Sequence, residues 1–228
     1  MKKVRVISLG GSLIIPEKVD YTLLESFKKV LRKNYGKNKF VVVCGGGSIA
    51  RKYIFLLKKE GKPIKEQSLA GIRATRMNSN VMIQFFGDEA NKSVPMSMKE
   101  VRSNLKKNKV VFCGALRYAE KETTDGTAAK LAKYFKTELI NLSNVSGLYT
   151  SNPLKNKKAK FIRTISWKSF DEMASKIPYK PGQHFILDQN AAKIIRKNKT
   201  PAYLFGPDMK NLNNYLNGKK FIGTEIKE

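Results

Sequence analysis

The sequence is poor in several residue types on which specialised sites depend. Its 228 residues include one histidine and only two cysteines, Cys44 and Cys113. A single histidine argues against a metal site built from protein side chains. Each cysteine ends an apolar run beside a glycine, so we expect buried, reduced thiols and no disulfide framework. No apolar run approaches the ~18 residues that span a bilayer, and the chain starts on a strand pattern. We therefore expect a cytoplasmic protein that does not bind membranes.

Acidic residues are also scarce. Eighteen Asp and Glu stand against 45 Lys and Arg, which gives a formal net charge of +27. This balance invites a nucleic-acid interpretation. The lysines are spread along the whole chain, however, and no basic arm or aromatic-interleaved RNA-binding pattern accompanies them. We expect a generally basic surface that attracts anionic substrates and binds nucleic acid weakly and without specificity at most.

What the chain does have is a regular alternation of strand and helix patterns. Strands are predicted at 4–9, 40–44, 110–113, 138–142, 202–205 and 221–226. Helices are predicted from 21 to just before Gly36, and at 48–59, 69–86, 98–107, 127–135, 188–197 and 209–217. The alternation predicts a mainly parallel sheet with helices on both faces and ligands at the carboxyl ends of the strands. The polar stretch 149–160 should be a loop or a small hairpin, and the whole chain, residues 1–228, should form one domain.

Two glycine clusters follow the first two predicted strands. Gly10-Gly11-Ser12 comes after the first strand, and Gly45-Gly46-Gly47-Ser48 after the second. A strand that ends in glycines and opens a helix leaves backbone N–H groups free at the positive end of the helix dipole, where an anion binds. Glycine also lets a phosphate approach the backbone closely. A third cluster, Thr123-Thr124-Asp125-Gly126, precedes another helix, and the three together predict a phosphate-handling enzyme. Taken singly, each is a turn or a helix cap.

These three clusters belong to a longer series of motifs. The series continues with Asn144 to Tyr149, Asn152-Pro153, residues 188–195 and Gly223 to Ile226. In order and spacing it resembles the amino-acid kinase superfamily, and within it the archaeal type of uridylate kinase. The resemblance implies a three-layer αβα sandwich with a mainly parallel central sheet. An acceptor-binding half would cover about residues 1–135 and an ATP-binding half about 136–228. It also implies Mg²⁺ bound with ATP, and a homo-oligomer, a hexamer built from dimers.

The resemblance assigns roles residue by residue. The implied catalytic residues are Lys193, which would neutralise charge on the transferring phosphoryl group, and Asn144. Residues implied to contact ATP are Gly10, Gly11, Ser12, Gly47, Arg51, Ser143, Asn144, Tyr149 and Asn152. Residues implied to contact UMP are Gly46, Arg51, Ser68, Thr123, Thr124 and Asp125. A guanidinium fork such as that of Arg51 suits a phosphate, and an anionic acceptor needs no general base. The alternative for Arg51 is a solvated surface arginine. Lys193 taken alone would be a helix-surface residue, and His184 is a structural or surface residue.

Several positions depart from the family pattern. Ser8 stands where many superfamily members have a lysine, and Ser68 where an acid grips the acceptor ribose. Ser146 and Asn152 replace aspartates of the ATP-side motifs, and the loop 115–122 is longer than usual. These changes spare the phosphate-binding turns but weaken the case for UMP in particular.

Three hypotheses follow from these observations. The first is a UMP kinase that makes UDP and ADP from UMP and MgATP in pyrimidine nucleotide biosynthesis. The second is a kinase of the same fold with another small phosphate or acidic acceptor, such as isopentenyl phosphate; those kinases place a histidine where this chain has Arg51. The third is a catalytically degenerate homologue that binds RNA on its basic surface. The presence of Gly46, Gly47, Arg51 and Lys193 together favours the first.

Overall fold

The computed structural model describes residues 2–118, 120, 122–151, 153, 156–177 and 187–228. Its helices are α1 (Gly11–Ile14), α2 (Tyr21–Asn34), α3 (Gly47–Lys59), α4 (Ile64–Phe86), α5 (Met98–Lys107), α6 (Thr124–Tyr134), α7 (Trp167–Ser175), α8 (Gln189–Asn198) and α9 (Met209–Leu216), with a 3-10 turn, η1 (Gly87–Glu89). Its strands are β1 (Lys3–Leu9), β2 (Asn38–Cys44), β3 (Val110–Cys113), β4 (Leu139–Leu142), β5 (Leu148–Tyr149), β6 (Phe161–Ile162), β7 (Thr164–Ser166), β8 (Ala202–Phe205) and β9 (Thr224–Lys227).

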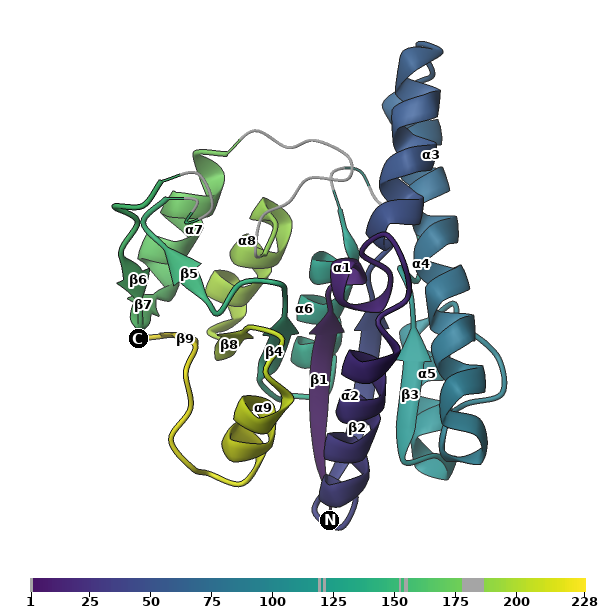
Figure 1. Ribbon diagram of the computed structural model, residues 1–228, viewed down its shortest axis with the longest axis vertical. Coiled ribbons are helices and arrows are strands. Elements are labelled where there is room, and N and C mark those ends of the chain that lie inside the picture. The colour runs from purple at the N-terminus through teal and green to yellow at the C-terminus, as the bar shows by residue number, and fades with distance from the viewer. Residues whose placement is uncertain (1, 119, 121, 152, 154–155, 178–186) are drawn as a thin grey trace.

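The described strands form a central sheet and a small hairpin. The central sheet has the order β3-β2-β1-β4-β8-β9-β7, and β5 pairs with β6 separately. Neighbours in the central sheet are parallel except for the antiparallel pair β8–β9. One face of the sheet packs against α5, α6, α7 and α8, and the other against α1, α2, α4 and α9. The predicted three-layer αβα architecture with a mainly parallel sheet is confirmed (Figure 1).

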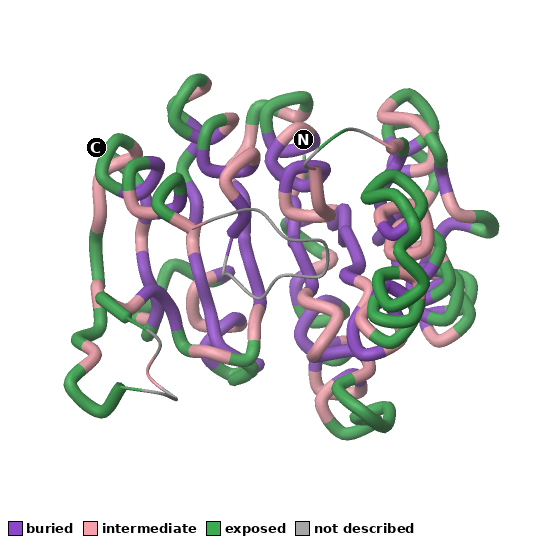
Figure 2. Tube along the Cα trace, turned by 90° about the horizontal axis from the view of Figure 1, so that it is seen from above, coloured by how far each residue is buried: buried purple, intermediate pink, exposed green. Residues whose placement is uncertain are grey.

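The apolar strand sequences explain why the sheet is covered on both faces. A strand buried on both faces is apolar at successive positions, without alternation. Val41, Val42 and Val43 of β2 are all fully buried, as are Val6 and Ile7 of β1. In Figure 2 these strands form the buried centre of the molecule, and the exposed segments lie outside them.

Several helices begin where a side chain caps them. Asp20 accepts a hydrogen bond from the backbone N–H of Leu23 at the start of α2 (3.0 Å), and Asp188 accepts one from Ala191 at the start of α8 (2.8 Å). Such caps satisfy N–H groups that lack a partner inside the helix. Both helices therefore begin where the sequence predicts.

Some boundaries differ from the sequence-based expectation. Helix α4 begins at Ile64, five residues before the predicted start, because Pro63 supplies a backbone φ of −56° that suits a helix entry. Strand β9 begins at Thr224 and not at 221. The pairing of β5 with β6 makes the stretch around 149–160 part of a small hairpin, as one of the two alternatives predicted. Within the described residues, none of the helices combines the length and apolarity needed to cross a membrane.

Candidate functional site

A cleft of about 1030 Å³ opens at the carboxyl ends of the parallel strands. This is the edge at which open α/β sheets bind ligands. The segments that follow β1, β2, β3 and β4 all contribute to its walls. The cleft brings together almost every described residue that the resemblance assigned to the site: Gly10, Gly11, Ser12, Gly46, Gly47, Arg51, Ser68, Thr123, Thr124, Asp125, Ser143, Asn144 and Tyr149.

The two glycine turns pack against each other, backbone to backbone. A Cβ atom on Gly11 would lie 2.0 Å from the backbone nitrogen of Gly47, and one on Gly45 would lie 2.4 Å from the nitrogen of Gly11. Gly47 also has a φ of +62°, a conformation that side-chain-bearing residues rarely adopt. Only glycines allow the two backbones to approach this closely. The two turns therefore form one continuous surface in the cleft.

That surface presents the starts of two helices. Helix α1 begins at Gly11 and α3 at Gly47, and the first N–H groups of a helix have no partner inside it. Arg51 lies one turn into α3 and lines the same cleft. Backbone N–H groups of the two turns, the positive end of α3 and the guanidinium of Arg51 together suit a phosphate or another anion.

The floor of the cleft holds a buried polar network centred on Asp125. Ser8 donates its hydroxyl to Oδ1 of Asp125 (2.7 Å), and Nδ2 of Asn141 donates to the same oxygen (3.3 Å). Thr123 accepts from the backbone N–H of Asp125 (3.1 Å) and donates its own hydroxyl to Asp188. The network thus fixes the starts of α6 and α8 relative to β1 and β4.

Burial and mutual repulsion disturb the ionisation of the two aspartates. Desolvation, together with the nearby charge of Asp188, raises the pKa of Asp125 to about 7. Burial also raises the pKa of Asp188, although the hydrogen bonds it accepts act in the opposite direction. A cation near Asp125 would relieve this repulsion, because opposite charge favours the ionised carboxylate.

Comparison with known proteins assigns the chain to a family. The model of the amino acid kinase family matches residues 3–206. The chain belongs to the amino acid kinase family. It is 33% identical to the uridylate kinase of Thermoplasma volcanium over 98% of this chain and 97% of that protein, and 29% identical to that of Methanobrevibacter smithii over 97% of each.

Solved structures of amino acid kinases share the fold. The crystal structure of the uridylate kinase from Archaeoglobus fulgidus matches with a TM-score of 0.83 and 31% identity, covering 99% of this chain and all of the other. The UMP kinase structure from Ureaplasma parvum matches with a TM-score of 0.79 at 19% identity, over the full length of both chains, which indicates a common fold.

In this member of the amino acid kinase family, the loop after β4, which the resemblance assigns to ATP, is held by local contacts. The hydroxyl of Ser143 donates to the carbonyl of Val145 (3.1 Å), and Thr224 of β9 accepts from the N–H of Leu148 (2.8 Å). Tyr149 packs edge-on against Phe161 of the hairpin, with ring centroids 5.3 Å apart. The loop that carries Asn144 is thereby attached to the last strand of the sheet.

The described cleft lining does not support the role predicted for Lys193. Lys193 lies on the second turn of α8 with an exposed side chain, and it is not among the described residues that line the cleft. Asn152 and His184 lie outside the described residues. The role assigned to Lys193 stays a prediction.

Conversely, the cleft contains functional groups that the sequence-based site omits. Among the described lining residues, Lys176 is the second cation beside Arg51, and Glu122 and Asp188 join Asp125 as acids. Glu122 is paired with Lys130 of α6. Asp188 was recognisable only as a helix cap, and Lys176 follows a helix that the sequence did not reveal. Neither pattern indicates a ligand by itself.

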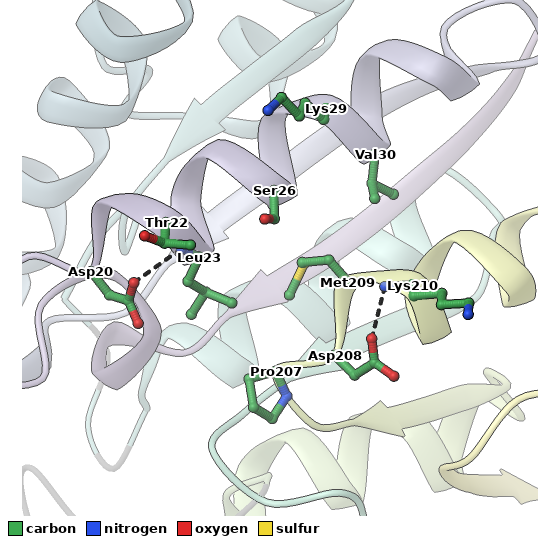
Figure 3. A pocket seen from close by; sticks show the side chains of 10 residues that line it. All are labelled: Asp20, Thr22, Leu23, Ser26, Lys29, Val30, Pro207, Asp208, Met209 and Lys210. Carbon is green, nitrogen blue, oxygen red and sulfur yellow. Dashed lines mark hydrogen bonds between the residues drawn. The ribbon is translucent and has the colours of Figure 1, made fainter.

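A second, shallower hollow of about 570 Å³ lies between the starts of α2 and α9 (Figure 3). Its two carboxylates already cap helices. Asp20 accepts from Leu23, and Asp208 accepts from the backbone N–H groups of Lys210 (2.9 Å) and Asn211 (3.3 Å). None of the predicted site residues lines this hollow. The cleft beside the glycine turns is therefore the candidate active site.

Proposed function

We propose that this protein is a uridylate kinase, which transfers the γ-phosphoryl group of MgATP to UMP and releases UDP and ADP. The observation that carries the proposal is the joint surface of the two glycine turns, in a chain that aligns almost end to end with uridylate kinases. The reaction would be a cytoplasmic step of pyrimidine nucleotide biosynthesis.

The residues of the cleft suit phosphoryl transfer between two phosphates. That reaction needs the acceptor oxygen in line with the γ-phosphorus, and positive charge around the equatorial oxygens. In the proposed arrangement Arg51 holds the acceptor phosphate, and the helix starts at Gly11 and Gly47 receive the transferring group. Lys193 would add charge from α8. The acceptor phosphate is already an anionic nucleophile, so proton removal by the protein is not required.

The cleft is also compatible with a Mg²⁺ ion that arrives with the nucleotide. Mg²⁺ is commonly held by substrate phosphates, waters and one or two carboxylates. Within the described residues there is no cluster of three His, Cys, Asp or Glu side chains that could hold a metal. The phosphates would therefore supply most of its ligands, and Asp125 on the cleft floor would supply the carboxylate. When bound, such an ion would neutralise charge on the transferring phosphate.

We propose further that the two halves of the chain divide the substrates. Six residues of these assignments line the cleft: Ser68, Thr123, Thr124, Ser143, Asn144 and Tyr149. In this proposal the first three bind the acceptor and the last three bind ATP. Asn152 belongs to the same ATP-side assignment by resemblance.

A homo-oligomer belongs to the same proposal. The helix pair α3–α4 projects beyond the rest of the molecule in Figure 1. It exposes several large apolar side chains, among them Phe55, Leu56 and Met77, each more than half exposed. Apolar surface of this kind is expected to be covered by another protein surface. A second copy of the chain is the expected partner, and sedimentation velocity would measure the assembly.

A coupled ADP-release assay tests the function. The purified protein is given MgATP and, in parallel, UMP, CMP, dUMP, AMP or isopentenyl phosphate. We expect UMP to give the highest kcat/KM. If isopentenyl phosphate or another acceptor is preferred, the second hypothesis replaces the first while the fold assignment stands. If no acceptor stimulates ADP release, the degenerate-homologue hypothesis gains support.

A further inference from the structure

One turn of α4 holds two loops of the cleft, and its Thr75 also lines the cleft. Nδ2 of Asn78 donates a hydrogen bond to the carbonyl of Gly45, in the second glycine turn (2.7 Å). Three residues earlier on the same helix, the hydroxyl of Thr75 accepts from the backbone N–H of Ala115 (3.1 Å). The segment after β2 and the segment after β3 are therefore attached to a common support.

Arg76 strengthens the second attachment. Its guanidinium donates from Nε to the carbonyl of Ala115 (3.1 Å) and from Nη2 to the carbonyl of Leu116 (3.0 Å). Arg76 is half-buried, and this partial burial lowers the pKa of its guanidinium. Two donors of one rigid fork thus replace the water that these carbonyls would otherwise bind.

Helix α4 and the loop after β3 are in close contact, with no space for an additional atom between them. A Cβ atom on Gly114 would lie 2.5 Å from the hydroxyl oxygen of Thr75 and 2.8 Å from the backbone nitrogen of Arg76. Thr75 is 7% exposed and Asn78 is 4% exposed. The loop therefore lies directly on the helix backbone, where small displacements of either would break the hydrogen bonds.

Ala115 lines the cleft, whereas Arg76 is not among the described lining residues. We propose that Arg76 is a positioning residue: by holding the carbonyls of Ala115 and Leu116 it keeps the loop after β3 in place as a preformed wall for the acceptor. The identity of the acceptor rests on the proposed function. A wall that is fixed before binding lowers the entropic cost of ordering it around the ligand.

Kinetics with a matched control test this role. Arg76→Ala is compared with Arg73→Ala, an exposed arginine on the same helix. We expect Arg76→Ala to raise the KM for UMP about fivefold or more, while kcat and the KM for ATP change less than twofold. Arg73→Ala should match the wild type. An equal KM for UMP in the two variants, or a fall in kcat with an unchanged KM, would overturn the proposal.

A second measurement separates this role from the assignment of the substrate. Amide hydrogen exchange of the segment 113–118 is followed in the nucleotide-free protein. Arg76→Ala should accelerate exchange there and not in β1, and unchanged exchange contradicts the proposal whatever the substrate is. A wild type that is inactive with UMP would instead refute the proposed function.

A second pair of variants guards against misfolding of Arg76→Ala. Thr75→Val removes the acceptor for the Ala115 N–H but keeps the side-chain shape, and Thr75→Ser keeps the acceptor. The valine variant should repeat the rise in the KM for UMP and the faster exchange, and serine should restore both. Equal behaviour of the valine and serine variants would contradict an anchored loop.

Discussion

Arg51 is the side chain in the cleft whose chemistry most directly matches a phosphate. It lines the cleft one turn beyond the glycine turn, where its charge adds to that of the helix start. Its neighbour Lys52 instead forms a surface ion pair with Glu17 at 2.8 Å, with both side chains mostly exposed. Adjacent cations on one helix therefore have different surroundings, which allows a matched comparison.

Arg51→Ala should act mainly on acceptor binding. A charge-assisted hydrogen bond contributes roughly 1.5–3 kcal/mol, so the KM for UMP should rise about tenfold or more. Lys52→Ala should leave the kinetics unchanged, because exposed ion pairs contribute little. Steady-state kinetics with varied UMP provide the measurement. Equal kinetics in the two variants would return Arg51 to the general basic surface.

Lys193→Ala tests the predicted catalytic role of Lys193, a residue that is not among the described residues of the cleft lining. If its ammonium reaches the transferring phosphoryl group, kcat should fall on the order of 10²-fold with little change in the KM for ATP. Lys197, exposed one turn further along α8, provides the control. A fall of less than threefold would remove Lys193 from the mechanism.

The two thiols should be unreactive in the folded protein. Burial raises the pKa of Cys44 to about 12, and also raises the pKa of Cys113. The reactive thiolate is therefore nearly absent at pH 8 in the folded state, whereas unfolded thiols ionise near pH 8.5. A thiol-specific disulfide reagent should label neither cysteine natively and both in urea. Between the unfolded pKa of about 8.5 and the raised pKa of the folded state, only the unfolded thiols lose their protons. The free energy of unfolding therefore falls as pH rises above about 8.5.

At the scale of elements, the two glycine turns that pack backbone to backbone restrict the amino-acid sequence most strongly. Gly11→Ala places a methyl group against the backbone of the other turn. Because the clash is with backbone atoms, no side-chain movement can relieve it. We expect the free energy of unfolding to fall by about 1–3 kcal/mol or more, with a large loss of activity. Gly36→Ala is the control, because its Cβ would have no neighbour within 4 Å. Urea denaturation and the ADP-release assay measure both effects. A Gly11→Ala variant as stable and active as Gly36→Ala would contradict the interlock.

Element positions followed from the sequence wherever burial or caps left a local mark. The apolar runs of β1 and β2 and the cap at Asp20 fixed those elements closely. Strand β7 and helix α7 were not predicted, because β7 is three residues long and half-exposed, and its partner β9 is distant in sequence. A short strand of this kind forms because it pairs with a strand that is distant in the sequence. No local sequence pattern indicates that pairing.

The site residues that come directly after strands were predictable from the sequence. The glycine turns and Thr123 lie there, and their convergence is a property of parallel sheets. The contacts of Arg76 and Asn78 were not predictable, because nothing in the sequence of α4 indicates which carbonyls its polar residues face. The same holds for Lys176 beyond the end of α7.

At the scale of the whole molecule, the charge of +27 determines how the protein meets polyanions. Scattered lysines can release phosphate counterions but cannot read base edges, so oligonucleotides should bind weakly and without sequence preference. That binding should collapse between about 50 and 200 mM salt. Binding of UMP should persist much better, because salt screens an enclosed phosphate site less. Paired titrations with a labelled oligonucleotide and with UMP measure both. Tight, sequence-selective oligonucleotide binding at the higher salt would favour an RNA-binding protein.

The order of the strands has a consequence for the order of folding. Among the described strands β7 pairs with β9, and β9 also covers the outer edge of β8, although it is the last of them in the sequence. The parallel block from β3 to β8 can therefore assemble while the backbone groups along the outer edge of β8 still face water. Unpaired edges of this kind join readily to other strands. A folding intermediate without β9 is therefore the species most exposed to mispairing between copies, and docking of the antiparallel β9 ends that exposure.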